Sequence, residues 1–381
     1  MKQIAGNILT PHGFVSGVIE VSEEGRVARI EGDPIDERDV RDSAVPMVLA
    51  GFIDLHVHGG GGHDIMQGGQ ALARVAELHA RHGTTALLAT TMTASAADLN
   101  AAFTAMQALG MQRVSGRSRV LGAHLEGPYI NQGMLGAQPD FARGFDAAEL
   151  QRLHRLFPIR LITLAPEVPG NMEIIEALCA AGFRVQIGHT SGSYEDGLQA
   201  LSRGASGFTH LFNAMTGLHH RNPGMVGVAL AHAQFAEIIP DLIHVHRGAI
   251  RVALRAIPGL FCVTDSTAAA GMPDGQYRLG CHTVTKCLGG VRLADGTLAG
   301  STLTMDQALR NLVHEIGLSL SDASRLVSAH AADYLGVADR GRLAAGAWAD
   351  AVLLDRDLNL VDVFVEGCSI EHAPDRTSCR E

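Results

Sequence analysis

Apolar and polar positions alternate in short stretches at both ends of the chain. Residues 18–21 (VIEV) and 27–30 (VARI) are separated by Gly, Asp and Pro, which predicts a small antiparallel β unit over residues 1–48. Residues 341–381 contain the same kind of stretch, broken by Asp-rich turns. Neither end is long enough to bury one face alone, so we expect both ends to pair in a small β-sandwich beside the main domain.

The central part of the chain, residues 49–340, has a different pattern. Short apolar runs alternate there with helical patterns of about ten to fifteen residues, which is typical of βαβ units and a parallel sheet. Helices are expected over residues 70–82, closed by Gly83, and over 171–181, with Asn171 as N-cap. Eight repeats predict an α/β fold, a (β/α)8 TIM-like barrel. The expected strands are residues 51–56, 85–90, 120–126, 160–165, 184–189, 207–210, 237–244 and 260–265.

Charge and hydropathy exclude several classes of partner. The net charge of -10 argues against nucleic acid and anionic membranes, both of which reward a dense basic surface. No apolar run approaches the roughly 18 to 20 residues of a membrane helix, and the first residues lack a signal-peptide pattern. We therefore expect a cytoplasmic protein, whose site must supply local positive charge if the substrate is anionic.

Histidine is unusually frequent, with 19 residues. Histidine is the commonest metal ligand and a frequent acid or base in catalysis. Those that lie among helical or polar residues are expected at the surface, namely His79, His82, His154, His219, His232 and His314.

The ends of the expected strands carry the remaining chemistry. In a (β/α)8 barrel the reaction takes place at the carboxyl ends of the strands. His56 and His58 point to the same side of one strand, roughly 6 to 7 Å apart, and can bind one ion. The residues at the ends of the other strands add further ligands to this pair. The whole set is larger than one tetrahedral ion needs, so two divalent ions are expected. The full expected ligand set is His56, His58, Glu126, His189, His210 and Asp265.

Several segments carry a family resemblance that covers nearly the whole chain. Residues 51–59 (GFIDLHVHG) resemble the first-strand signature of the amidohydrolase superfamily, and residues 341–352 resemble its return to the β-sandwich. More narrowly, residues 124–129 (HLEGPY), 209–215 (THLFNAM) and 296–301 (GTLAGS) resemble the N-acetylglucosamine-6-phosphate deacetylase family.

The resemblance implies a role for each ligand and a reaction. Glu126 would bridge two ions, with His189 and His210 on the second ion and the H-x-H pair on the first. Zinc or iron is expected, and cobalt or manganese would suit the same ligands. Asp265 would take a proton from the attacking water and return it to the departing amine, giving acetate and an amino sugar phosphate.

The resemblance also implies a substrate site and a homodimer. Arg221 would bind the phosphate, either in its own subunit or across a dimer interface. Gln138 stands where some relatives have a histidine thought to polarise the carbonyl, and Met134 and Leu135 replace a stretch that is often basic. The other expected substrate contacts are Ala137, Gln138, Asn213, Ala214, His244, Leu298, Ala299 and Gly300.

Other functions remain open at this point. The substrate could be the galactosamine epimer, an unphosphorylated N-acetyl sugar or an N-acyl amino acid. A different class would be a catalytically inactive barrel that binds a sugar phosphate without changing it. The general base Asp265 and the full ligand set argue against a pure binding protein, because binding alone does not need a base.

Overall fold

Both ends of the chain enter one seven-stranded sheet in the computed structural model, which describes residues 2–370. Its strands are β1 (Lys2–Thr10), β2 (Gly13–Val21), β3 (Val27–Pro34), β4 (Met47–Ala50), β18 (Ala351–Leu354), β19 (Leu360–Val365) and β20 (Cys368–Ser369). The order across the sheet is β20-β19-β18-β4-β1-β2-β3, so the two ends pair directly at β18 and β4. The predicted pairing of the chain ends is confirmed, and residues 371–381 of that predicted unit lie outside the described residues.

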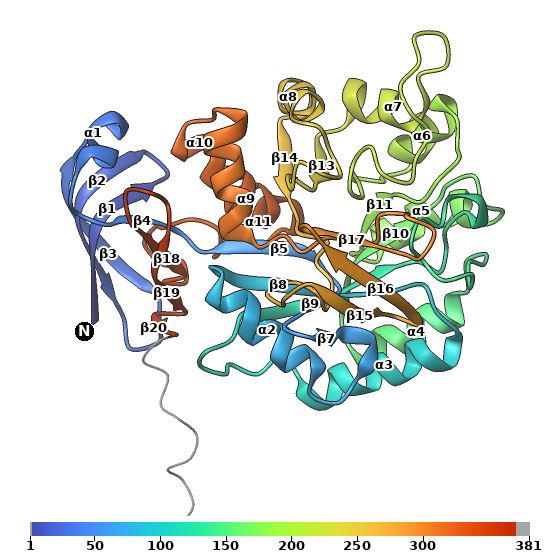
Figure 1. Cartoon of the computed structure of the whole chain (residues 1–381), viewed down its shortest axis with the longest axis horizontal. Coiled ribbons are helices and arrows are strands. Elements are labelled where there is room, and N and C mark those ends of the chain that lie inside the picture. Colours follow the sequence, from blue (N-terminus) through green and yellow to red (C-terminus); the bar gives the residue numbers. More distant parts are fainter. Residues whose placement is uncertain (1, 371–381) are drawn as a thin grey trace, which may run out of the picture.

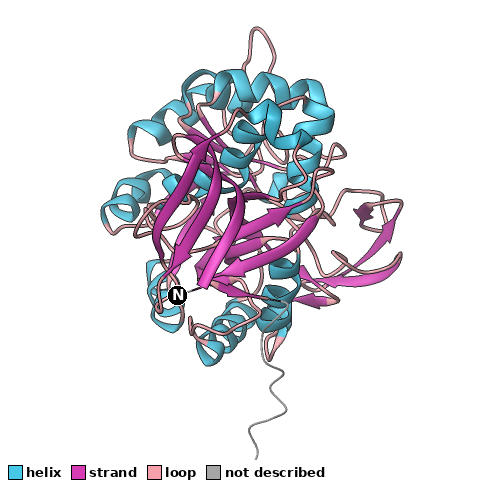
Figure 2. Cartoon of the chain, turned by 90° about the vertical axis from the view of Figure 1, so that its left-hand side faces the viewer, coloured by secondary structure: helices cyan, strands magenta, loops and turns pink. Residues whose placement is uncertain are grey.

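The sheet built from the chain ends has a core of its own. It occupies the left-hand part of Figure 1 and faces the viewer in Figure 2. Ile4, Ile8 and Ile19 pack there with Leu343 and Ala351 from the other end of the chain. Successive side chains of a strand point to opposite faces, so the alternating sequence pattern supplies one buried face to this core. Helix α1 (Glu37–Asp42) lies between β3 and β4.

The barrel strands come from a six-stranded and a two-stranded parallel sheet, which together give eight strands in the described part of the chain. Backbone hydrogen bonds connect the two sheets, from the Leu211 N–H to the Glu237 carbonyl and from the Asp265 N–H to the His56 carbonyl, both 2.9 Å. The predicted (β/α)8 class is confirmed. The strands are β5 (Phe52–Val57), β8 (Thr84–Thr91), β9 (Arg119–Glu126), β10 (Ile159–Leu164), β11 (Arg184–Ile187), β12 (Gly207–Phe208), β13 (Phe235–Ile238) and β14 (Gly259–Cys262).

Helices follow the strands and cover the outside of the barrel (Figure 1). Every residue of β5 and β8 is buried, as expected for strands covered on both faces. The helices are α2 (Ala71–Arg81), α3 (Ala96–Leu109), α4 (Ala147–Leu156), α5 (Asn171–Ala180), α6 (Tyr194–Ser202), α7 (Gly224–His232), α8 (Arg247–Ala256), α9 (Met305–Asn311), α10 (Leu320–Ser324) and α11 (His330–Leu335), with π-helical turns at Leu312–Ile316 and Arg325–Ala329.

Three local predictions were wrong. The strand expected over 237–244 ends at Ile238, because Pro240 has no N–H to donate to a neighbouring strand. Gly170, and not Asn171, is the N-cap of α5, since the Asn171 amide donates to the carbonyls of Tyr129 and Ala165. His79 is fully buried, because the inner face of α2 places it under the glycine run that follows β5.

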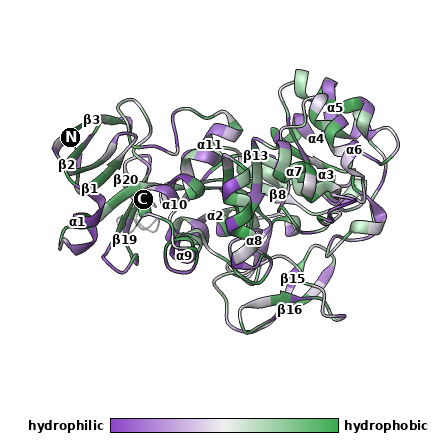
Figure 3. Ribbon diagram, turned by 90° about the horizontal axis from the view of Figure 1, so that it is seen from above, coloured by the Kyte–Doolittle hydropathy of each residue, from purple (hydrophilic) through white to green (hydrophobic). Residues whose placement is uncertain are grey.

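Short excursions from the barrel surround the ends of its strands. They comprise β6 (Gly59–Gly60) with β7 (His63–Asp64), and the antiparallel β15 (Gly275–Leu279), β16 (His282–Cys287) and β17 (Gly290–Arg292). Figure 3 shows β15 and β16 projecting from the barrel body. Within residues 2–370, no helix is long and apolar enough to cross a membrane.

Candidate active site

Six side chains able to bind metal converge where the barrel strands end, and each is less than a tenth exposed. Three of them follow the ends of β11, β12 and β14 with left-handed backbone, namely His189 (φ 49°), His210 (φ 28°) and Asp265 (φ 49°). Such a conformation costs a residue with a Cβ of order 1–3 kcal/mol and persists where the surroundings impose it. The complete set is His56, His58, Glu126, His189, His210 and Asp265.

Three of these side chains form what we call the second ligand group, consisting of His189 Nε2, His210 Nε2 and Glu126 Oε1. Each of these atoms lies 3.1 Å from the other two. The His189 Nδ1–H donates to the Met134 carbonyl at 2.9 Å, which leaves a lone pair on Nε2. Three electron-rich atoms therefore face one point.

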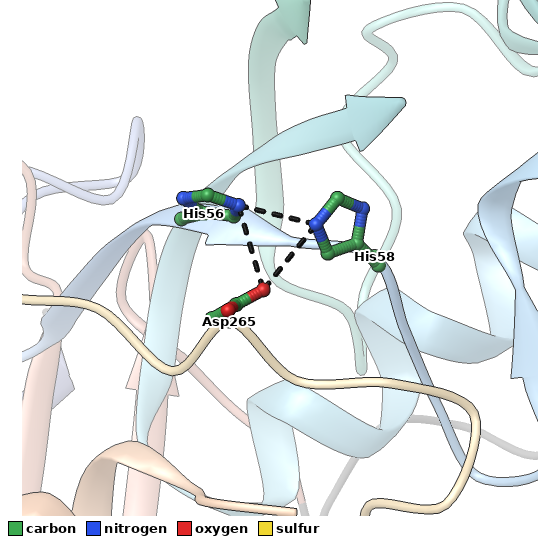
Figure 4. Close-up of side chains that lie close together, drawn as sticks. All are labelled: His56, His58 and Asp265. Atoms are coloured by element: carbon green, nitrogen blue, oxygen red, sulfur yellow. Dashed lines mark hydrogen bonds and ion pairs between the residues drawn. The ribbon is translucent and has the colours of Figure 1, made fainter. Parts of the chain in front are cut away.

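The other side chains form the first ligand group, consisting of His56 Nε2, His58 Nε2, Asp265 Oδ1 and Glu126 Oε2. Figure 4 shows the two imidazoles and the Asp265 carboxylate facing one another. The two imidazole nitrogens are 3.1 Å apart, and they lie 3.5 Å (His56) and 3.3 Å (His58) from Asp265 Oδ1. Glu126 Oε2 is 3.1 Å from His58 Nε2 and 3.5 Å from His56 Nε2. Glu126 thus contributes one oxygen to each group.

The spacing of these atoms fits divalent metal ions. Ligand atoms about 2.0 to 2.1 Å from a tetrahedral ion lie roughly 3.3 Å from one another. The observed separations of 3.1 to 3.5 Å match that value in both groups. The Nδ1 atoms of His58 and His210 are buried without a hydrogen-bond partner among the described residues. A cation between the facing Nε2 atoms and carboxylate oxygens of each group would offset the repulsion of their lone pairs.

A further set of buried side chains makes hydrogen bonds that orient the candidate metal ligands. His56 Nδ1 is 3.0 Å from Glu237 Oε2, which also accepts the His210 backbone N–H at 3.2 Å. Asp54 Oδ1 accepts the backbone N–H of His56, and its Oδ2 accepts the Thr264 hydroxyl at 2.6 Å. Partners of this kind fix the ring orientation of metal-binding histidines.

The electrostatics of the site follow from burial and facing charges. Burial alone would lower the pKa of His56, but the carboxylates of Glu126, Asp265 and Glu237 outweigh it and raise that pKa well above its usual value. Burial would raise the pKa of Asp265, whereas the positive charge of His56 and His58 lowers it below the ordinary range. The site therefore favours an ionised Asp265 and added positive charge at the ligand groups.

The ligand groups lie at the wall of a cavity of about 350 Å³. Small-molecule sites commonly occupy such concave spaces at the carboxyl ends of barrel strands. The expected substrate contacts on its wall are Ala137, Gln138, Asn213, Ala214, His244, Leu298 and Gly300, beside the ligands His58, Glu126, His189, His210 and Asp265.

Known proteins resemble this chain over almost its whole length. A sequence model of the amidohydrolase family matches residues 47–370. The chain is 39% identical to an N-acetylglucosamine-6-phosphate deacetylase of Lysinibacillus sphaericus, covering 84% of each chain, and 37% identical to an N-acetylgalactosamine-6-phosphate deacetylase of Escherichia coli O157:H7, covering 95% of this chain and 97% of that one. The chain belongs to the amidohydrolase family.

A solved structure extends this likeness to three dimensions. The amidohydrolase is similar, with a TM-score of 0.86 and 33% identity, to an aspartate-to-alanine variant of N-acetyl-D-glucosamine-6-phosphate deacetylase from Mycobacterium smegmatis in complex with N-acetyl-D-glucosamine-6-phosphate. The match covers 96% of this chain and 98% of that one. The resemblance inferred from the sequence motifs is thereby confirmed.

Two of the expected substrate contacts lie away from the cavity wall of this amidohydrolase. Arg221 is exposed in the segment between β12 and α7, where its guanidinium contacts His220 Nε2 at 2.8 Å. Ala299 is fully buried, and it packs under the cavity in a cluster with Met92, Leu279 and Val291. An exposed Arg221 has no contact with the cavity of its own subunit in this structure.

Other groups of the amidohydrolase site were missed from the sequence. Glu237 could have been found as an acid inside an otherwise apolar strand, but its partner His56 is 181 residues away. Asp241 could not have been found from the sequence, because only the fold shows that its Oδ2 lies 2.6 Å from His244 Nδ1. Met92, Met134 and Leu279 line the cavity without any distinguishing sequence signal.

Proposed function

We propose that this amidohydrolase hydrolyses the acetamide of N-acetyl-D-glucosamine 6-phosphate to D-glucosamine 6-phosphate and acetate. The observation that carries the proposal is the pair of ligand groups sharing Glu126, with the ionised Asp265 beside them on the wall of a sugar-sized cavity. The relatives named for this reaction, and the related complex with N-acetyl-D-glucosamine-6-phosphate, support the choice of substrate.

Two divalent ions per subunit are part of this proposal. His56, His58 and Asp265 would hold one ion, His189 and His210 would hold the other, and Glu126 would serve both. Histidine and carboxylate ligands suit zinc or iron, and also cobalt or manganese. Ions in these positions would supply Lewis acidity, which polarises the acetamide carbonyl and makes water a nucleophile near neutral pH.

Asp265 would be the acid and base of the reaction. Its lowered pKa keeps it ionised, so it can accept a proton from the attacking water while a new C–O bond forms at the carbonyl carbon. The same proton then passes from Asp265 to the amide nitrogen, because an amide anion is too basic to leave. The C–N bond breaks, and acetate and the free amine are the products.

Binding of the phosphate would depend on two cationic groups in an acidic protein. Burial would lower the pKa of His244, but its hydrogen bond with Asp241 outweighs burial and raises it, so His244 is a charged donor at the cavity wall. Arg221 would provide a planar guanidinium that suits phosphate. Because Arg221 is exposed, we propose that it serves the site of a neighbouring subunit in a homodimer.

Replacing Arg221 with Met should raise KM for the phosphorylated sugar by about 10- to 100-fold, because a charge-assisted hydrogen bond contributes roughly 1.5–3 kcal/mol. Little change is expected in kcat, or with the unphosphorylated sugar. Steady-state acetate release measures both parameters, and Arg356→Met, at an exposed side chain, is the matched control.

Mixing subunits tests where Arg221 acts. A hybrid of Arg221→Met and Asp265→Asn subunits contains one complete site only if the arginine reaches across the interface. At substrate concentrations well below the KM of Arg221→Met, activity above the sum of the two components supports this arrangement, and a mixture no more active than its two components contradicts it.

Replacing Asp241 with Asn should make substrate binding more sensitive to pH. Asp241 raises the pKa of His244, so the parent protein keeps a charged imidazole to higher pH than the variant. Asp265 and Arg292 also face His244 electrostatically and are the same in both proteins. KM for the phosphorylated sugar should therefore rise at a lower pH in the variant and converge with the parent in acid. An unchanged pH profile would mean that His244 does not bind the phosphate.

The decisive experiment compares three substrates with metal-replete protein. Acetate release is measured from N-acetylglucosamine 6-phosphate, its galactosamine epimer and unphosphorylated N-acetylglucosamine, before and after metal removal by a chelator. We expect the glucosamine phosphate to be hydrolysed fastest and the chelated protein to be inactive until metal is restored. Binding of the sugar phosphate without acetate release would indicate a binding protein.

The galactosamine epimer is the second candidate substrate. The 37% identity to the Escherichia coli N-acetylgalactosamine-6-phosphate deacetylase, over 97% of that protein, favours it specifically. A higher kcat/KM for the galactosamine phosphate would replace the first assignment and leave the metal chemistry unchanged.

A further inference from the structure

Gln138 contacts the shared carboxylate of the two ligand groups. Its Nε2 lies 2.5 Å from Glu126 Oε2, and its Oε1 lies 2.6 Å from the Thr93 backbone nitrogen. The side chain is 6% exposed at the cavity wall. It therefore connects the segment after β8 with the ligand at the end of β9.

The orientation of this amide is determined by its two partners. The Thr93 N–H can only donate, so the atom facing it must be the carbonyl oxygen of Gln138. The opposite orientation would place an NH₂ against an N–H and an oxygen against a carboxylate. The Gln138 amide is consequently a fixed donor to Glu126, and as a neutral group it keeps this role across the pH range.

The anchor of Gln138 on Thr93 is closely packed. A Cβ added at Gly127, where φ is +73°, would lie 2.0 Å from the Thr93 hydroxyl oxygen. Thr93 is fully buried and lies against the residue that follows Glu126. Gln138 therefore connects Glu126 to a buried segment packed beside it.

Gln138 contacts one of the two carboxylate oxygens of Glu126, namely Oε2. Oε2 belongs to the first ligand group, whose separations range from 3.1 to 3.5 Å, whereas Oε1 belongs to the second, whose separations are all 3.1 Å. A carboxylate oxygen has about two lone-pair positions, so Oε2 can accept the Gln138 N–H and still bind one ion. Rotation of the carboxylate about its own axis would move both oxygens, and the Gln138 hydrogen bond to Oε2 opposes that rotation.

We propose that Gln138 is a positioning residue that holds Glu126 in its bridging orientation and thereby sustains the metal affinity of the first ligand group. The inference depends on the two-metal part of the proposed function and is independent of the substrate. The second ligand group depends less on Gln138, because its Glu126 atom is Oε1, which Gln138 does not contact, and the Met134 carbonyl orients His189 separately.

The test is zinc binding by Gln138→Met, which preserves the size of the side chain and removes both hydrogen bonds. Metal-free protein is titrated with Zn²⁺ against a chromogenic chelator, and the two dissociation constants are compared with those of the parent. One of the two dissociation constants should rise by about 10- to 100-fold, the usual effect of removing a partner of a metal ligand. The other should remain close to that of the parent.

Gln132→Met is the matched control, because Gln132 lies on the same loop and its amide donates to Asp140 at the surface. Both affinities should be unchanged in the control. Equal affinities of Gln138→Met and parent at both sites, or an equal loss at both, would overturn the proposal. Zinc binding is measured without substrate, so a wrong substrate assignment leaves this result intact.

Crystals of the parent protein grown at limiting zinc provide a test that does not depend on how the variant folds. Anomalous scattering should show zinc at the ligand groups, with the Gln138 amide on Glu126 Oε2 in the metal-bound protein. A Gln138 amide turned away from Glu126 would refute the inference.

Discussion

Asp265→Asn should lower kcat for acetate release by about 10²- to 10⁴-fold, the usual contribution of a general acid and base. Asparagine keeps the size of the side chain and an oxygen toward the first ligand group, but it cannot accept the proton of the attacking water. In the metal-free parent, burial would raise the pKa of Asp265, but the facing His56 and His58 lower it, so the acceptor is ionised. The measurement is acetate release at saturating substrate, together with metal content.

The metal content separates loss of the base from loss of an ion, since Asp265 Oδ1 also belongs to the first ligand group. A variant with both ions bound and low kcat supports the proposed role. Asp357→Asn is the matched control, because Asp357 is 73% exposed and far from any ligand contact in the described structure. A kcat within tenfold of the parent, with both ions bound, would assign the base to another group.

Glu366→Ala should lower the free energy of unfolding by about 3–5 kcal/mol, the usual cost of removing one partner of a buried ion pair. Glu366 is 6% exposed and accepts hydrogen bonds from Arg119, Arg340 and Arg113. Its removal leaves the nearly buried Arg119 without its counter-charge, and leaves Arg340 with Asp350 alone, where the barrel meets the sheet of the chain ends. Urea unfolding at pH 7 measures the loss.

The control for Glu366 is Glu31→Ala. Glu31 pairs with Arg29 at the surface, where both side chains are more than half exposed, and such pairs contribute about 0–1 kcal/mol. A loss in Glu366→Ala no larger than in this control would show that the buried cluster is not stabilising.

The pH dependence of the free energy of unfolding provides a second test of the stabilising role of Glu366. Burial would raise its pKa, but hydrogen bonds from Arg119 and Arg340 outweigh burial and lower it to about 2, from 4.5. A depressed pKa stabilises the folded state above pH 4.5, and this contribution is lost as pH falls toward 2. Glu366→Ala should therefore unfold with a weaker acid dependence over that interval.

The chain's periodicity predicted most of the architecture. Continuous apolar runs become strands buried on both faces, as in β5 and β8, and alternating runs become the sheet of the chain ends. The strand ends then indicated the candidate metal ligands, because in a barrel parallel strands bring their carboxyl ends to one mouth. Local exceptions such as Pro240 and Asn171 depended on individual hydrogen bonds that periodicity does not describe.

The sequence by itself determined the fold class, the family and the identity of the six candidate ligands, since each follows from local pattern and residue type. Only the tertiary structure decided how they group, with Glu126 giving one oxygen to each set. It also decided that Gln138 contacts Glu126, that Asp241 contacts His244 and that Arg221 lies away from its own cavity. The physical reason is that hydrogen bonds and charges act over a few ångströms in space, whereas Glu237 and His56 are 181 positions apart in the chain.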